Sequence, residues 1–212
     1  SSSVLEVGCG TGQLARQLAA RGVDVTAIDI GPTMVAMARR RETSGSVAFQ
    51  VISFEEYAAD DGSFDLIVSA DALHWIDPEV KFCKSARLLR TGGRLALLSI
   101  EQVYDEPLRT ELQAIWVARS DDTGAWLREP GPTIAEAISD SGLFETPIET
   151  RLPTRRWLPA LSVIDLECTR ATYLGWDENA RRAFTEELSS LLRSNPVELT
   201  EVAAVTLAQP RT

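Results

Sequence analysis

Short apolar runs alternate with amphipathic stretches through the first hundred residues of the chain. The apolar runs predict strands at 4–7, 23–28, 47–52, 64–69 and 94–100. Apolar positions at helical spacing between them predict helices at 13–21, 32–41 and 78–89. Because strands and helices alternate, we expect a parallel sheet with helices on both faces.

From residue 101 onwards, longer helical stretches replace this alternation. Periodicity predicts helices at 108–116, 133–141, 158–174 and 178–193, and strands at 144–152 and 199–207. The segments 101–131 and 153–196 are long for simple connections in a sheet domain, so we expect them to form a helical cap. We expect 132–152 and 197–212 to return to the sheet of 1–100, which gives an α/β fold with seven, mostly parallel strands.

The first predicted strand runs directly into a glycine-rich loop, Gly8-Cys9-Gly10-Thr11-Gly12, and a helix follows. Glycines allow a ligand to approach the backbone closely, and they adopt φ > 0 without strain. Asp29 ends the next apolar run, where a carboxylate can accept hydrogen bonds from both hydroxyls of a ribose. Three glycines with two placed acids, Glu6 and Asp29, exceed what a tight turn needs and indicate a nucleoside site.

The spacing of the glycines distinguishes between nucleotides. A dinucleotide fingerprint, G-x-G-x-x-G, requires a third glycine at the position that Gln13 occupies here. The loop instead resembles motif I of the class I S-adenosylmethionine (SAM)-dependent methyltransferases. The segment 62–77, which contains F-D-L-I-V-S-A-D-A-L-H-W, resembles motif IV of the small-molecule branch, methyltransferase type 11, which includes trans-aconitate methyltransferases. L-L-R-T-G-G-R-L at 88–95 is similar to the usual turn before strand five.

This resemblance implies a Rossmann-like enzyme that moves a methyl group from SAM to an oxygen, nitrogen or carbon of a small molecule and releases S-adenosylhomocysteine (SAH). It implies that Asp29 binds the ribose, and that the glycine loop surrounds the methionine part of SAM. The cofactor-binding residues implied in this way are Glu6, Gly8, Cys9, Gly10, Gly12, Asp29, Ile30, Met34, Ser53, Phe54, Ser69 and Ala70. Helices that usually precede motif I have no counterpart before Ser1, so we expect a piece of a longer protein.

His74, the only histidine, follows the fourth predicted strand, where the methyl acceptor is expected. Its unperturbed pKa near 6.5 suits a general base or a group that orients the acceptor. The alternative is a structural histidine that packs beside Trp75. Candidates for substrate contacts are Trp75, Tyr104, Trp116 and Arg119, although most aromatic residues of the cap are expected to be core.

Charge and cysteine content narrow the classes of partner. A net charge of −10 over 212 residues argues against a nucleic-acid substrate. No apolar run reaches the roughly 20 residues that a membrane-spanning helix needs. Three cysteines without metal-ligand spacing predict no metal site and a reducing cytoplasm. The sequence is compatible with a monomer or a homodimer.

Other functions remain open at this point. A non-catalytic SAM-binding or regulatory protein would share the glycine loop. An NAD-dependent oxidoreductase is disfavoured by Gln13, and an aminopropyltransferase by the small number of acids, Asp71 and Asp77, available for a polyamine. A nucleic-acid methyltransferase is further disfavoured because no N-P-P-Y-like run follows the fourth strand.

Overall fold

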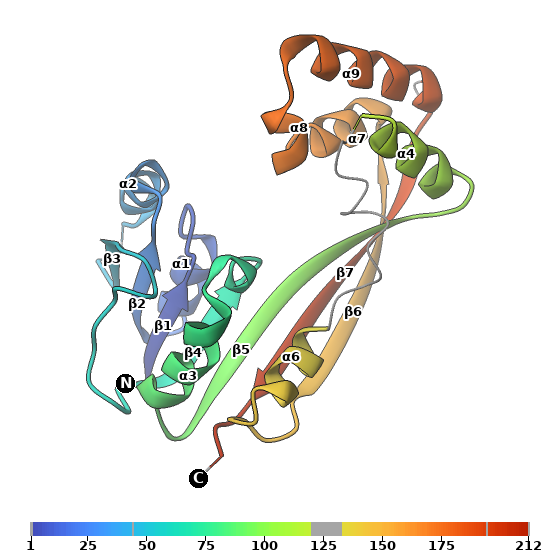
Figure 1. The fold of residues 1–212 in the computed structure, drawn as a ribbon. Helices are drawn as coiled ribbons and strands as arrows, with labels where there is room; N and C mark the ends of the chain where they lie inside the picture. Colours follow the sequence, from blue (N-terminus) through green and yellow to red (C-terminus); the bar gives the residue numbers. More distant parts are fainter. Residues whose placement is uncertain (1, 44, 120–132, 194, 212) are drawn as a thin grey trace. The chain divides into compact units, whose positions relative to one another are not determined.

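The structure is a computed structural model that describes residues 2–43, 45–119, 133–193 and 195–211 (Figure 1). The strands are β1 (Ser3–Val7), β2 (Asp24–Asp29), β3 (Val47–Val51), β4 (Phe64–Ala70), β5 (Leu89–Tyr104), β6 (Ile148–Leu158) and β7 (Val197–Ala208). The helices are α1 (Gln13–Ala19), α2 (Pro32–Arg41), η1 (Leu73–Trp75), α3 (Pro78–Leu88), α4 (Leu108–Val117), α6 (Ile134–Asp140), α7 (Ala160–Glu167), α8 (Ala171–Gly175) and α9 (Glu178–Leu192). The segment 120–132, part of the expected cap, lies outside the described residues.

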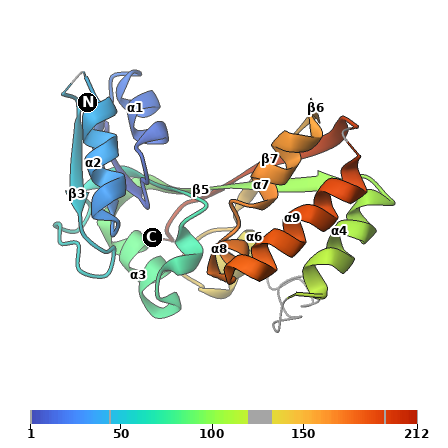
Figure 2. The ribbon, with the colours of Figure 1, turned by 90° about the horizontal axis from the view of Figure 1, so that it is seen from above.

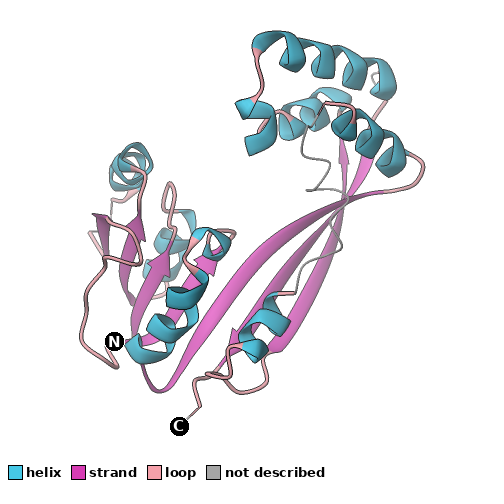
Figure 3. Ribbon diagram, viewed as in Figure 1, coloured by secondary structure: helices cyan, strands magenta, loops and turns pink. Residues whose placement is uncertain are grey.

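The strands form one sheet in the order β3-β2-β1-β4-β5-β7-β6 (Figure 3). β1 pairs in parallel with both β2 and β4, so that Leu5 lies opposite Thr26 on one side and Ile67 on the other. β2 and β3 are also parallel, as are β4 and β5. β7 runs in the opposite direction to β5 in Figure 1. The predicted seven-stranded, mostly parallel sheet is therefore confirmed.

Helices cover both faces of the parallel part of the sheet. Leu5 and Ile67 belong to one buried cluster, together with Phe82 of α3 and Ile138 of α6. The neighbouring positions along β1 and β4 belong to a second cluster with α1 and α2. Side chains alternate between the faces of a strand, so continuous apolar runs allow both faces to be buried.

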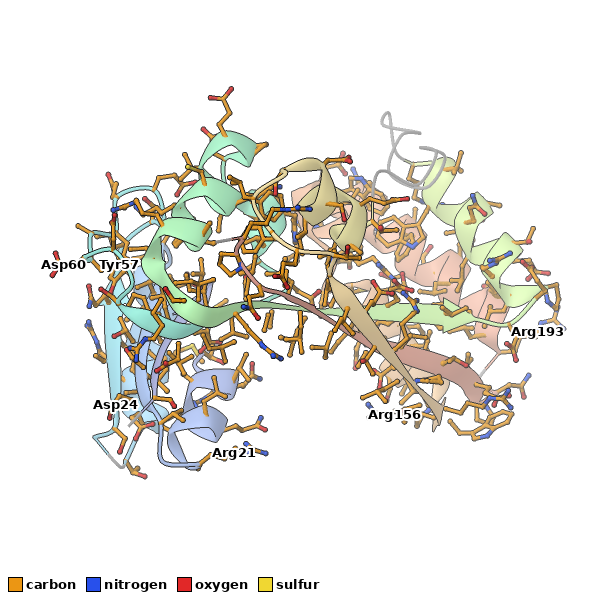
Figure 4. The ribbon with its side chains drawn as sticks, turned by 90° about the horizontal axis from the view of Figure 1, so that it is seen from below. Arg21, Asp24, Tyr57, Asp60, Arg156 and Arg193 are labelled. Atoms are coloured by element: carbon orange, nitrogen blue, oxygen red, sulfur yellow. The ribbon has the colours of Figure 1, made fainter. Side chains whose placement is uncertain are left out.

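The described residues divide into two compact units. The first comprises the described part of 2–100 and residues 133–151 and 204–211, and the second comprises 101–119 and the described part of 152–203. The second unit has its own core, in which Trp116, Phe184 and Leu188 are almost fully buried. Its helices α4, α7, α8 and α9 lie together in Figure 2. On its strands, Arg156 of β6, labelled in Figure 4, pairs with Glu201 of β7 at 2.7 Å.

Three elements differ from those expected. The strand predicted over 144–152 is β6, which begins four residues later and extends six residues beyond the predicted end. The helix predicted over 158–174 is two helices, because Arg170 adopts an extended conformation between α7 and α8. The fifth strand is longer than predicted and includes the glycine pair before it. The pairing of β4 and β5 shifts register between Phe64 and Leu66, and a Cβ on Gly93 would approach the carbonyl oxygens of Arg90 and Phe64 to 2.9 and 3.1 Å. Gly93 therefore permits a bulge where the sequence indicates a strand boundary.

Candidate active site

The glycine loop turns sharply after β1 and is held by backbone hydrogen bonds. Gly8, Gly10 and Gly12 have φ of 75°, 52° and 74°, in the left-handed region that favours glycine. The N–H groups of Gly8 and Cys9 both donate to the carbonyl of Ile28, at 2.9 and 3.0 Å. The loop is thereby fixed to the end of β2, the strand that carries Asp29.

Two of these glycines are also required by close packing. A Cβ on Gly8 would lie 2.2 Å from the Cβ of Ala72, and one on Gly12 would lie 2.8 Å from the ring of Phe49. A Cβ on Gly10 would meet nothing within 4 Å. The loop therefore contacts the segment that follows β4, which brings together two motifs about sixty residues apart in the sequence.

Asp29 connects the glycine loop to the start of α2. Its Oδ2 accepts the backbone N–H of Gly10 at 2.8 Å, and its Oδ1 accepts the N–H of Gly31 at 2.7 Å. Each carboxylate oxygen carries two lone pairs, so both can accept a further hydrogen bond from a ligand. Asp29 is half-buried and lines the cavity described below.

Glu6 and Cys9 lie behind the loop and are buried. Burial raises the pKa of Glu6 to about 7, with a smaller opposing effect from a hydrogen bond to the backbone of Ala15. Its Oε2 has no hydrogen-bond partner among the described residues. Burial, Glu6 and Asp29 together raise the pKa of the Cys9 thiol to about 12, so Cys9 is a neutral thiol at pH 7 and not a nucleophile.

A cavity of about 460 Å³ opens at the carboxyl ends of β1, β2 and β4, and we call it the loop cavity. Its walls are Val7 and Gly8, residues 28–30, residues 52–55, residues 70–72, and Trp75 with Ile76. Of the predicted cofactor residues, it brings together Gly8, Asp29, Ile30, Ser53, Phe54 and Ala70. Met34 lies on α2, half exposed, and is not among the lining residues.

A second cavity, of about 230 Å³, lies next to the loop cavity in the same unit, and we call it the histidine cavity. It is lined by Ser69 of β4, residues 71–74, residues 97–99 of β5, Lys81 and Phe82 of α3, and Ile134 and Ala137 of α6. Asp71 and Ala72 line both cavities. Two ligands, one bound in each cavity, would therefore be neighbours at this shared wall.

Asp71, at this shared wall, has an unusual backbone conformation. It is a non-glycine residue with φ of 50°, and its backbone N–H donates to the carbonyl of Leu98 at 3.0 Å. Left-handed backbone at a residue of this kind is uncommon and is concentrated at functional sites. The buried hydroxyl of Ser69, one residue before the end of β4, donates to the carbonyl of Val7 at 2.9 Å and ties β4 to β1.

His74 lies in the short helix η1, is exposed, and lines the histidine cavity. Its ring lies 4.8 Å from that of Trp75. Trp75 itself is 76% exposed and lines the loop cavity, so it is a wall residue and not core. The two aromatic neighbours therefore face different cavities.

The three candidates from the expected cap lie in the second unit. Tyr104 and Trp116 are buried, and both donate to the carboxylate of Glu167, at 2.9 and 3.0 Å. Arg119 pairs with Glu187. The structure therefore gives Tyr104 and Trp116 roles in the core of that unit.

Several lining residues of the histidine cavity were not identified from the sequence. They are Asp71 as a wall residue, Lys81, Phe82, residues 97–99, Ile134 and Ala137. The position of Asp71 directly after a buried strand was a usable signal. Ile134 and Ala137 lie about thirty positions beyond β5 in the sequence, so only the packing of α6 reveals them.

A glycine loop after β1, a carboxylate at the end of β2 and this strand order define a Rossmann-like domain that binds a nucleoside at the carboxyl ends of its strands. Comparisons with known proteins narrow the class further. Residues 5–97 match the family described as methyltransferase domain. An uncharacterised methyltransferase of Mycobacterium tuberculosis is 30% identical over 200 residues, which cover 91% of this chain and 74% of that protein.

Two more relatives agree with this match. A ubiquinone biosynthesis O-methyltransferase of Xanthomonas euvesicatoria is 32% identical over 70% of this chain and 68% of its own. The structure of phosphoethanolamine N-methyltransferase 2 of Haemonchus contortus with SAM has a TM-score of 0.54 and 22% identity, over 100% of this chain and 49% of its own. The chain therefore belongs to the SAM-dependent methyltransferases. The narrower likeness to trans-aconitate methyltransferases stays a prediction.

Family membership decides against the NAD-dependent oxidoreductase that the glycine loop alone left open. Among the described helices, none combines the length and the apolar character that a membrane crossing needs.

Proposed function

We propose that this methyltransferase transfers the methyl group of SAM to an oxygen, nitrogen or carbon atom of a small molecule bound in the histidine cavity. The observation that carries the proposal is the wall of Asp71 and Ala72, which the two cavities share. With the cofactor in the loop cavity and the acceptor in the histidine cavity, donor and acceptor atoms meet at that wall.

The residues of the loop cavity fit SAM. Asp29 retains acceptor capacity on both oxygens for the ribose hydroxyls. Ile30 and Phe54 provide apolar surface for the adenine ring, and Gly8 allows close approach of the loop to the methionine part. Buried Glu6, with its unpartnered Oε2, supplies an acceptor behind the loop for a cationic group or a water molecule.

When bound, SAM supplies a methyl group already activated on a positively charged sulfur, so the protein has mainly to align the acceptor and exclude water. His74 lines the histidine cavity, and its imidazole would take the proton of a hydroxyl acceptor or orient it. A carboxylate acceptor would need no base.

The class of acceptor follows from charge and from the relatives. The net charge of −10 favours a small molecule over a nucleic acid. The named relatives methylate oxygen in one case and nitrogen in another, so both atoms remain candidates.

The three cysteines, Cys9, Cys83 and Cys168, are free, which agrees with a reducing cytoplasm.

The competing function is a SAM-binding protein without an acceptor. The histidine cavity, with its polar groups next to the loop cavity, favours an enzyme. Isothermal titration with SAH, with NAD run alongside, tests the cofactor. Micromolar binding of SAH alone supports the proposal, and binding of NAD or of neither overturns it. Mass spectrometry of small acids, phenols and amines incubated with SAM then identifies the acceptor, and tight SAH binding without any methylated product would favour the non-catalytic protein.

A further inference from the structure

Lys81 is an unusual residue in the wall of the histidine cavity. Only two of the 21 basic residues in the sequence are lysines, Lys81 and Lys84, and both lie on α3. Lys81 lines the histidine cavity, whereas Lys84 lies one turn further along the helix and outside that lining.

The other cations of α3 have oxygen partners. Lys84 donates to the carbonyl of Glu55 at 2.9 Å, and Arg87 pairs with Asp61 at 2.5 Å. Among the described residues, no salt bridge involves Lys81. Its Nζ lies 5.2 Å from the centroid of the Phe82 ring. The ammonium of Lys81 is therefore available to an anionic ligand.

The surroundings of Lys81 strengthen such a contact. More than half of the lining residues of the histidine cavity are apolar: Ala72, Leu73, Phe82, Leu97, Leu98, Ile134 and Ala137. Charge-assisted hydrogen bonds are stronger than neutral ones, and low local polarity increases the attraction between opposite charges. An acid with an apolar body fits both the charge and the walls.

The wall that the histidine cavity shares with the loop cavity has a different chemistry. Asp71, with Ala72, forms the wall shared with the loop cavity, and His74 also lines the cavity. A carboxylate and an imidazole suit a group that carries a proton, such as a hydroxyl or an amine. The acceptor atom therefore belongs beside Asp71 at the shared wall, and the anionic group belongs at Lys81, which lines the histidine cavity and not the loop cavity.

Charge also indicates which anion fits. A single ammonium balances one negative charge. An open groove between α3 and α6 shares Lys81, Phe82 and Ala137 with the histidine cavity, and it also presents the carboxylates of Glu79 and Asp140. Together with Asp71 they would repel a second negative charge, which favours a carboxylate over a phosphate.

We infer that the methyl acceptor is a small hydrophobic carboxylic acid, whose carboxylate binds Lys81 and whose hydroxyl or amine lies beside Asp71 at the shared wall of the histidine cavity. This inference rests on the proposed function, because it assigns the histidine cavity to the acceptor.

The two lysines make a direct test possible. Reductive methylation with ¹³C-formaldehyde labels both lysines and the terminal amine and preserves their charge, and Lys81→Arg assigns the Lys81 signal by its loss. With SAH present, we expect benzoate to shift the Lys81 signal saturably. We expect benzamide, its neutral counterpart, to leave it in place, and phenyl phosphate to bind more weakly.

Variants give the second measurement. By calorimetry, Lys81→Gln should lower benzoate affinity about tenfold, the loss of one charge-assisted hydrogen bond. Lys81→Arg should recover part of it. Arg87→Gln, which removes a cation of the same helix outside the histidine cavity, should leave benzoate affinity unchanged. SAH affinity should be unchanged in all three.

The outcomes are distinguishable. Equal responses to benzoate and benzamide, a shift at Lys84 instead of Lys81, or no benzoate binding while SAH binds would overturn the acid acceptor and leave the proposed function standing. Tighter binding of phenyl phosphate would overturn the choice of carboxylate. Failure of SAH to bind would overturn the proposed function, and with it the assignment of Lys81 to an acceptor.

Discussion

The Oδ2 atom of Asp29 accepts the backbone N–H of Gly10 at 2.8 Å, so the residue proposed to bind the ribose also holds the glycine loop in shape. Sequence motifs assign these two functions to different segments. In the folded chain the carboxylate that holds the loop is also the one proposed to bind the ribose, so substitutions at position 29 should affect the loop and the ligand together.

We expect Asp29→Ala to weaken SAH binding by roughly 10²-fold, because it removes two hydrogen bonds to the loop and α2 as well as those to the ribose, each of about 1 kcal/mol or more. Calorimetry measures the change. Asp24→Asn provides the control, since Asp24 is an exposed residue at the start of the same strand (Figure 4). Native affinity in Asp29→Ala would contradict the assignment to the ribose.

Gly8→Ala and Gly10→Ala form a matched pair. Both place a side chain at φ > 0, which costs about 1–2 kcal/mol. Only Gly8→Ala adds a clash, because its Cβ would lie 2.2 Å from Ala72. We expect Gly8→Ala to show a clearly larger loss of thermal stability and of SAH affinity. Equal losses in the two variants would show that the contact with Ala72 is unimportant.

Stability should fall as the pH rises from about 4.5 to 7, through the effect of Glu6. Its pKa is raised from 4.5 to about 7 in the folded chain, mainly by burial, so the folded state binds a proton more tightly than the unfolded state in this interval. The contribution is roughly 3 kcal/mol, fully present below pH 4.5 and lost above 7. Urea unfolding at several pH values measures it.

Glu6→Gln should remove this pH dependence, because the amide resembles the protonated acid and does not titrate. The variant should gain stability relative to the natural chain at pH 8 and not at pH 4. Glu186→Gln, at an exposed position of α9, serves as the control and should leave the profile unchanged. An identical slope in Glu6→Gln would assign the pH dependence to other groups.

His74→Ala should leave SAH affinity within about twofold and lower turnover by roughly 10²-fold if the imidazole acts as a base. The first expectation follows from its position, since His74 lines the histidine cavity and not the loop cavity. Unchanged turnover would mean that His74 only packs beside Trp75.

Glu167 should be essential for the stability of the second unit. Its buried carboxylate accepts from Tyr104, Trp116 and, through two nitrogens, Arg170. Glu167→Ala leaves Arg170 without this partner and should cost about 3–5 kcal/mol, whereas Tyr104→Phe removes one hydrogen bond and should cost about 1 kcal/mol. Denaturant unfolding compares the two, and similar small losses would contradict the network.

The sequence predicted contacts between residues best where those residues lie at the ends of strands that follow one another along the chain. Gly8 and Gly10 follow β1, and Asp29 ends the adjacent parallel strand β2, so their meeting follows from the alternation of strand and helix alone. Lys81 and Ala137 meet only because α3 and α6 pack on the same face, which no local pattern encodes.

Residues of the second unit show another limit. Tyr104 and Trp116 could equally have lined a pocket, because an aromatic residue on an apolar face has the same pattern in either role. Their role is decided by Glu167, whose buried carboxylate accepts hydrogen bonds from both side chains. Glu167 lies 63 positions from Tyr104 and 51 positions from Trp116 in the sequence. An acid at the end of a largely apolar helix gives no sign of its partners.

The wall shared by the two cavities has a practical consequence for redesign of the enzyme. Asp71 and Ala72 cannot be altered for a new acceptor without disturbing the neighbouring pocket, and Ala72 also abuts Gly8. Three other residues line the histidine cavity and do not line the loop cavity: Leu97, Ile134 and Ala137. Libraries built at these three positions would therefore vary the acceptor while every member keeps the same donor.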